Sequence, residues 1–173
     1  MKSVRLIFNS AAALCLILGG VWVLQGIGVL PGSFMTGETE WAVYGGLLIL
    51  VALAALVRAG LELFTELPAT AERTVVLFTD LHAGNVLRAE RAPWLAIDPK
   101  PFVGDPAYDA TQHLFNCLGR MQRDPLATIA SFADRLGLSR ERVRLWTFAR
   151  AAAEPRGRWS ENPWLEVARR IAP

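Results

Sequence analysis

Two long uncharged segments in the first sixty residues constrain the fold of this chain more than any other feature. Residues 6–30 and 41–57 contain no Asp, Glu, Lys or Arg. The second segment has 17 residues, and as a helix it spans about 26 Å, near the lower limit for crossing the hydrocarbon core of a bilayer. The turn-forming residues 31–37 separate the two segments. The pattern therefore predicts a two-helix transmembrane hairpin over residues 1–59, with the lipid bilayer as its partner.

The placement of basic residues predicts the orientation of this hairpin. Lys2 and Arg5 precede the first segment and Arg58 follows the second, whereas the connecting loop carries only Glu38 and Glu40. The positive-inside rule then places both termini in the cytoplasm and the connecting loop outside. A cleaved signal peptide is the alternative for the first segment, but no small-x-small cleavage site follows the apolar run.

Glycine pairs in the two segments predict close contact between the helices. Gly19-Gly20 and Gly45-Gly46 are small enough to let two backbones approach inside a membrane, although membrane helices also tolerate glycine without such contact. Residues 4–57, with the loop LPGSFMTG and the following Trp41-Ala42, resemble small bacterial two-span membrane proteins of unknown function. This resemblance implies membrane placement and no chemistry.

Residues 60–173 have the composition of an ordinary charged soluble domain. The whole chain is 53% hydrophobic, carries a formal net charge of +2 and has two cysteines. A disordered chain, a disulfide scaffold and a strong nucleic-acid binder are therefore excluded. Arginines at 140, 142, 144 and 150 alternate with Glu141 and Glu154, which is typical of a solvated helix face.

Local signals predict the elements of this domain. Residues 61–73 read as a short helix-like run followed by a connector that contains Pro68. Residues 75–78 read as a buried strand, and the apolar runs 86–87 and 94–97 flank a polar turn, which is typical of a hairpin. Helices are expected to begin after capping residues and to end at glycine or proline. The expected helices cover 106–118 with a stop at Gly119, 125–136 with a stop at Gly137, 140–154, and a last one from 163.

One loop carries the residues that indicate chemistry. Asp80-Leu81-His82-Ala83-Gly84-Asn85 follows the strand, and its D-L-x-x-x-N spacing matches the catalytic loop of protein kinases. Asp98 ends the hairpin 18 residues after Asp80. Phosphoryl transfer to an alcohol requires a carboxylate that accepts the hydroxyl proton and oxygen ligands for Mg²⁺. Asp80 is the candidate base, and Asn85 and Asp98 are the candidate metal ligands.

The segment TDLHAGNVLRAERAPWLAIDPKPFVGDPAYDATQHLFN is similar to the aminoglycoside/hydroxyurea phosphotransferase family of the streptomycin 6-kinase type. The resemblance implies a kinase-like C-lobe over residues 60–173, use of ATP and Mg²⁺, and phosphorylation of an alcohol group of an aminoglycoside-like antibiotic. It also implies that His82 and Asn85 lie at the cofactor and that Asp109 supports the loop. Phe78 stands where many members of the wider fold have a histidine.

The expected fold is mainly α: a transmembrane hairpin over 1–59, followed by a truncated kinase-like C-lobe of helices with a short β-hairpin over 60–173. A kinase also needs a glycine-rich loop and a phosphate-binding strand lysine, whereas this sequence has only Lys2 and Lys100. We therefore expect a weakly active or inactive phosphotransferase fragment. The alternatives are a non-catalytic membrane-anchored interaction protein and a fused gene product.

Overall fold

The computed structural model describes the backbone of residues 2–154 and 162–173, and the side chains of 2–10, 12 and 13 are outside the description. The orientation prediction from Lys2 and Arg5 therefore falls on side chains outside the described set. The chain divides into two compact units, residues 1–59 with Pro173, and residues 60–172. Each unit is described by itself.

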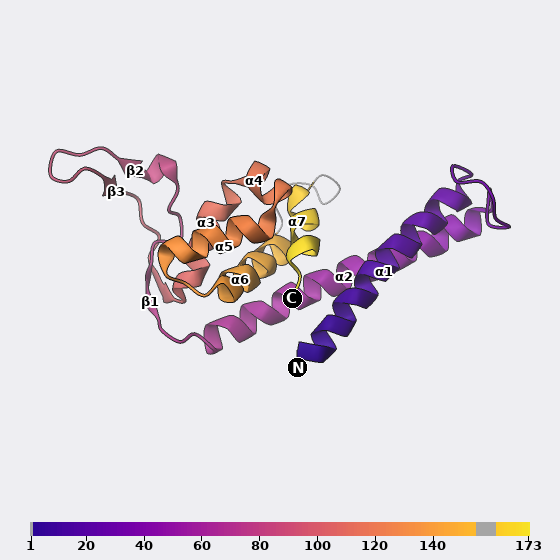
Figure 1. The fold of residues 1–173 in the computed structure, drawn as a ribbon, viewed down its shortest axis with the longest axis horizontal. Helices are drawn as coiled ribbons and strands as arrows, with labels where there is room; N and C mark the ends of the chain where they lie inside the picture. Colours follow the sequence, from indigo (N-terminus) through magenta and orange to yellow (C-terminus); the bar gives the residue numbers. More distant parts are fainter. Residues whose placement is uncertain (1, 155–161) are drawn as a thin grey trace. The chain divides into compact units, whose positions relative to one another are not determined.

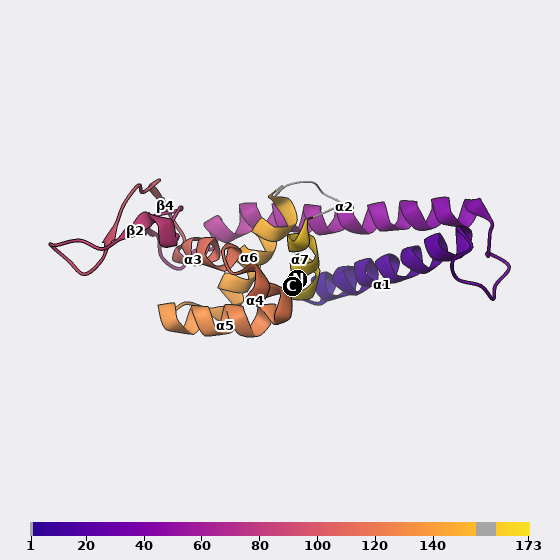
Figure 2. The same cartoon turned by 90° about the horizontal axis from the view of Figure 1, so that it is seen from above.

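Two antiparallel helices form the N-terminal unit, and their packing depends on glycine. Helix α1 covers Lys2–Gly26, and α2 covers Thr39–Ala69. In Figures 1 and 2, α1 lies beside the first half of α2. A Cβ atom added to Gly45 would lie 2.5 Å from the carbonyl oxygen of Gly19, whereas one added to Gly20 or Gly46 would meet nothing within 4 Å. The predicted close approach is thus confirmed for one glycine of each pair.

Aromatic rings gather at the loop end of this unit. Trp41 makes edge-to-face contacts with Trp22, Phe34 and Tyr44 at centroid separations of 5.3, 5.6 and 5.9 Å. Pairs of this geometry add about 0.5–1.5 kcal/mol each beyond burial. The cluster therefore fixes the turn between α1 and α2.

The apolar surface of α2 fits a membrane by length and composition. Within the described residues, α2 is the one helix long and apolar enough to cross a bilayer, and 22% of its most apolar window is buried. The apolar stretch described in α1, Leu14–Gly26, is shorter. That α1 also crosses the bilayer, as a two-span hairpin requires, stays a prediction.

The C-terminal unit is a cluster of helices with short strands at one end, as Figures 1 and 2 show. Its helices are α3 (Pro106–Phe115), α4 (Leu118–Arg123), α5 (Pro125–Leu136), α6 (Arg140–Ala153) and α7 (Pro163–Ile171), and η1 (Ala83–Asn85) is a 3-10 turn. The mainly helical fold is confirmed. The core between these helices is formed by apolar side chains that are at most 2% exposed, among them Leu114, Met121, Ile129, Val143, Phe148, Val167 and Ile171.

Capping residues begin the helices where the sequence predicts. The side chains of Asp105, Asp124, Ser139 and Asn162 each accept a hydrogen bond from a first-turn N–H. Helix α5 ends at Gly137, whose φ of 62° is the left-handed conformation that favours glycine. These local devices explain why the starts of α3, α5, α6 and α7 are confirmed.

Two helix ends differ from the prediction. The stop at Gly119 is wrong, because α3 already ends at Phe115 and Gly119 lies within α4. The side-chain amide of Asn116 donates to the carbonyl of Gln112 at 2.9 Å and replaces the backbone donor that would continue the helix. Helix α2 continues through Pro68 to Ala69, where a connector was expected, because Thr70 bonds the last carbonyls through both its N–H and its hydroxyl.

The strands form two small antiparallel sheets. Strand β1 (Val75–Leu77) pairs with β4 (Phe102–Gly104), and β2 (Val86–Leu87) pairs with β3 (Leu95–Ala96). The second pair is the predicted hairpin, which extends away from the helices in Figure 1. The first pair, here called the β1–β4 ribbon, was not predicted, and its residues Val76, Phe102 and Val103 are 69–74% exposed.

Candidate active site

The loop between β1 and η1 is held by a carboxylate on α3. Asp109 accepts hydrogen bonds from the backbone N–H of Phe78 at 2.7 Å and of Thr79 at 2.8 Å. Thr79 has a φ of 58°, which is unusual for a β-branched residue and requires support from its surroundings. The support that the resemblance implies for Asp109 is thus present, although Phe78 has no histidine side chain to contribute.

A second connection joins this loop to the end of the β2–β3 hairpin. The Thr79 hydroxyl donates to the carbonyl of Lys100 at 2.5 Å, and the Lys100 N–H donates to the carbonyl of Phe78 at 3.1 Å. Asp98 precedes this contact and has a φ of 54°. The sequence order strand, loop and hairpin therefore brings residues 78–80 and 98–100 side by side.

Asn85 is fixed against the backbone of both segments. Its side-chain N–H donates to the backbone carbonyl of Asp80 at 2.9 Å. Its backbone carbonyl accepts a hydrogen bond from the N–H of Ile97, also at 2.9 Å. Because the amide nitrogen is already bonded, the carbonyl oxygen Oδ1 is the end of the side chain that remains for a cation. The loop thus gathers Asp80, Asn85 and the residue before Asp98 into one compact arrangement.

The Asp80 carboxylate has three partners. Its Oδ2 accepts a hydrogen bond from Nζ of Lys100 at 2.6 Å, and its Oδ1 accepts one from Nε2 of Gln112 at 3.3 Å. Nε2 of His82 lies 3.9 Å from the same Oδ1. Nδ1 of His82 accepts a hydrogen bond from the N–H of Gly84 at 3.1 Å, so a neutral His82 carries its proton on Nε2 and presents a donor toward Asp80.

The ion pair shifts the pKa values of both partners. The ammonium of Lys100, through its hydrogen bond and its charge, holds the pKa of Asp80 below its ordinary value. Asp80, with a smaller contribution from the charge of Asp98, raises the pKa of Lys100. Lys100 is therefore part of the site. Its position after the predicted metal ligand Asp98 did not indicate this role.

Replacing Lys100 with Met is expected to raise the pKa of Asp80, because the carboxylate loses its charged donor. The pair contributes stability above pH 3.8, the ordinary pKa of the carboxyl group, and this contribution is lost as pH falls through the lower pKa of the folded state. Carbon-13 NMR of the Asp80 carboxyl carbon measures the shift. Arg140→Met removes an exposed ion pair with Asp134. This variant is the control and should leave the pKa of Asp80 unchanged.

The predicted metal ligands are of the residue types that Mg²⁺ takes when it is bound together with a nucleotide. Mg²⁺ in phosphoryl-transfer sites takes one or two carboxylates together with substrate phosphates and waters. Asn85 and Asp98 supply one amide oxygen and one carboxylate. Among residues 2–154 and 162–173, no group of three His, Cys, Asp or Glu side chains could hold a metal by itself. The donor set therefore suits a cation that arrives with phosphate and does not suit a structural metal.

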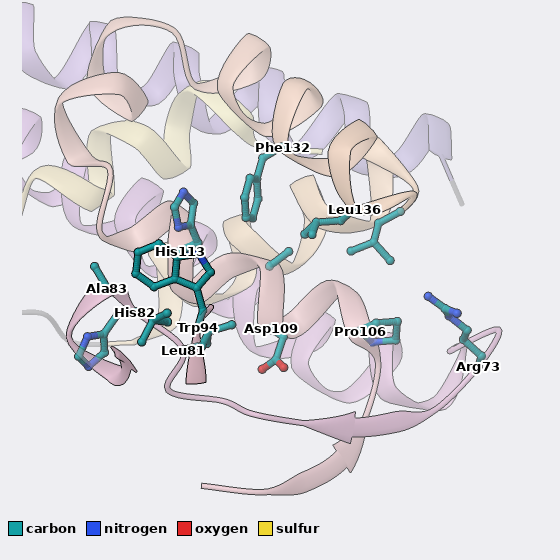
Figure 3. A pocket seen from close by; sticks show the side chains of 13 residues that line it. Arg73, Leu81, His82, Ala83, Trp94, Pro106, Asp109, His113, Phe132 and Leu136 are labelled. Carbon is teal, nitrogen blue, oxygen red and sulfur yellow. The ribbon is translucent and has the colours of Figure 1, made fainter. Parts of the chain in front are cut away.

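A cavity of about 770 Å³ opens beside the loop. Figure 3 shows Leu81, His82 and Ala83 of the loop on one side and Phe132 and Leu136 on the other. The imidazole of His113 stacks on the ring of Phe132 at a centroid separation of 4.4 Å. Asp80, Asn85 and Asp98 do not line the cavity, so it is separate from the candidate metal site.

The comparison with family models decides the relationship. The model described as "Aminoglycoside/hydroxyurea antibiotic resistance kinase" matches residues 47–162, about two thirds of the chain. This chain belongs to that family. The match begins before Gly60, where the resemblance was expected to start, and so includes the second half of α2.

Curated relatives agree with the family. The chain is 45% identical over 75 residues to a hydroxyurea phosphotransferase of Kitasatospora aureofaciens, covering 43% of this chain and 22% of the relative. It is 44% identical over 81 residues to a streptomycin 6-kinase of Streptomyces glaucescens and 43% identical over 81 residues to one of Streptomyces griseus, in each case covering 43% of this chain and 26% of the relative. The chain thus spans about a quarter of these family members. No solved structure matches the chain.

Proposed function

We propose that residues 60–172 are the catalytic lobe of an ATP- and Mg²⁺-dependent phosphotransferase that acts on an alcohol group of a small antibiotic-like molecule. The observation that carries the proposal is the arrangement around Asn85. Its side-chain amide donates a hydrogen bond to the backbone carbonyl of Asp80, and its backbone carbonyl accepts one from Ile97, the residue before Asp98. These hydrogen bonds hold the backbone of Asp80 and of Ile97 against Asn85. The proposal assigns a base and two oxygen donors to Asp80, Asn85 and Asp98. The names of the relatives support a kinase that acts on an aminoglycoside-like substrate.

Asp80 is the general base in this proposal. Its carboxylate orients the substrate hydroxyl and accepts the proton, while the hydroxyl oxygen bonds to the terminal phosphorus of ATP and the bond from that phosphorus to the ADP oxygen breaks. Asn85 and Asp98 would hold Mg²⁺, which neutralises the charge that develops on the phosphates. The Nε2–H of His82, which faces Asp80, would be the donor available to the transferred phosphate.

The 173 residues alone are proposed to be weakly active or inactive. Positioning and electrostatic stabilisation account for almost all catalysis in phosphoryl transfer. The two lysines of the sequence are Lys2 and Lys100, and Lys100 is already bonded to the base. A glycine-rich loop and a separate phosphate-binding lysine therefore have no candidates in this sequence.

The N-terminal unit is proposed to anchor the kinase-like lobe at the cytoplasmic face of a bacterial inner membrane, with α1 and the first half of α2 as a two-span hairpin. The length and apolar surface of α2 support the anchor. The contact between Gly19 and Gly45 supports the pairing of the two helices. Labelling of single cysteines in the 31–37 loop of intact cells tests the orientation.

Calorimetric titration of Mg²⁺–ATP into the full chain in detergent tests the proposed site. We expect weak binding that requires Mg²⁺ and is lost in Asp98→Asn and Asn85→Ala, whereas the exposed Asp134→Asn serves as the control. Transfer of labelled phosphate from ATP to streptomycin or hydroxyurea is expected to be slow or undetectable. Binding that persists without Asp80, Asn85 and Asp98 would contradict the proposal and favour a non-catalytic interaction protein.

A further inference from the structure

The two oxygens of the Asp80 carboxylate are held from opposite elements. Lys100 donates to Oδ2 from the hairpin end at 2.6 Å, and Gln112 donates to Oδ1 from α3 at 3.3 Å. Two donors on different oxygens, from two different elements, restrict rotation of the Asp80 side chain about its Cα–Cβ bond as well as its Cβ–Cγ bond. The hydrogen bond from the Gln112 amide is longer than the one from the Lys100 ammonium, and its donor is neutral. Oδ1 is therefore the less tightly held oxygen.

The orientation of the Gln112 amide is determined by a third residue. Nη2 of Arg150 lies 3.4 Å from Oε1 of Gln112. A guanidinium only donates and a carboxylate only accepts. The amide therefore has one favourable orientation, with its oxygen toward Arg150 and its NH₂ toward Asp80. The flipped amide would place NH₂ against the guanidinium and oxygen against the carboxylate.

Arg150 is itself immobilised. Its side chain is 7% exposed, and Glu154 accepts two hydrogen bonds from it, at 2.7 and 3.1 Å. Nη1 donates to the hydroxyl of Thr111 at 2.6 Å, and the guanidinium lies 4.9 Å from the ring centroids of both Tyr108 and Phe115. The prediction that Arg150 belongs to a solvated helix face is therefore wrong.

We propose that Gln112 is a positioning residue for Asp80 and that Arg150 acts on Asp80 only through Gln112. The chain of contacts from Glu154 through Arg150 and Gln112 fixes the rotamer of the carboxylate and keeps Oδ1 as the oxygen that receives the substrate proton. The assignment of the proton rests on the proposed function. The fixed rotamer does not depend on it.

Three-bond NMR couplings to Cγ of Asp80 report its rotamer directly in the full chain without nucleotide. The native protein is expected to show one rotamer. Gln112→Met, which keeps the length of the side chain and removes the amide, is expected to show averaged couplings. Gln122→Met is the matched control, because Gln122 is an exposed glutamine on α4, and should leave the couplings unchanged.

A double-mutant cycle tests the role of Arg150. Arg150→Met is expected to average the Asp80 couplings although the guanidinium has no hydrogen bond to Asp80. Adding it to Gln112→Met is expected to change nothing further, since both substitutions remove the same contact. A single Asp80 rotamer in Gln112→Met, or fully additive effects, would overturn the proposal.

A measurement on Asp80→Asn keeps the test decisive where Arg150→Met fails to fold. The side-chain NH₂ signals of Gln112 are expected to shift in this variant, and those of Gln122 are not. Unshifted Gln112 signals would contradict the contact with Asp80. Fixed couplings together with absent Mg²⁺–ATP binding would support the positioning role and overturn only the proposed function.

Discussion

Asp105→Ala is expected to destabilise the C-terminal unit by about 3–5 kcal/mol, the cost of leaving one partner of a buried ion pair alone. The Asp105 side chain is 4% exposed and pairs with Arg142, which is 19% exposed. The same carboxylate accepts from the indole N–H of Trp146 at 2.7 Å and from the N–H of Ala107 at the start of α3 at 2.9 Å. One substitution therefore removes this acceptor from a part-buried cation, a buried indole and a helix start.

Hydrogen–deuterium exchange of the full chain measures this loss in α3 and α6. Asp134→Ala is the matched control, because the pair that Asp134 forms with Arg140 is 48% and 66% exposed and pairs of this kind contribute about 0–1 kcal/mol. Asp105→Asn retains an oxygen for the cap and is expected to lie between the two. Equal exchange in Asp105→Ala and Asp134→Ala would contradict the role assigned to the buried pair.

Asp109→Ala is expected to release the loop between β1 and η1 while the helices remain folded. The substitution removes two charge-assisted hydrogen bonds, from the N–H groups of Phe78 and Thr79, each worth about 1.5–3 kcal/mol. It also removes the support for the positive φ of Thr79. We expect the loop to open with a free energy lower by about 3 kcal/mol, which accelerates amide exchange about 100-fold.

The N–H of Lys100 is the informative probe of this opening. It bonds the carbonyl of Phe78 and not Asp109, so its exchange reports the loop and not merely the loss of an acceptor. Amides in the middle of α6 serve as the internal reference and should keep their protection. Unchanged exchange at Lys100 would show that the loop does not depend on Asp109. Asp109→Asn, which retains one acceptor oxygen, is expected to have an intermediate effect.

The sequence predicted correctly those helix starts and ends whose signals lie within a few neighbouring residues. The start of α3 depends on Asp105 followed by proline, and the end of α5 depends on Gly137, and both are confirmed. The loop motif also lies within six residues, so its chemistry could be proposed from spacing. The β1–β4 ribbon was missed because each strand has three residues and its partner lies more than twenty positions away.

The contacts that organise the site are long-range and could not be predicted in the same way. Gln112 lies 32 positions from Asp80, and Arg150 lies 38 positions from Gln112. Arg150 alternates with acidic residues as an exposed arginine would, so its charge pattern favoured a solvated face. Only the packing of α6 against α3 buries it. The roles of Gln112 and Lys100 follow from the same packing and have no local signal.

The β1–β4 ribbon has a consequence for how this protein behaves at high concentration. A two-stranded sheet has two open edges, and natural proteins protect such edges with charges, proline or a covering element. Here the exposed side chains of Val76, Phe102 and Val103 are apolar. Strand addition between copies at this ribbon is therefore a route by which protein purified in detergent would self-associate, and Val103→Lys is expected to reduce it.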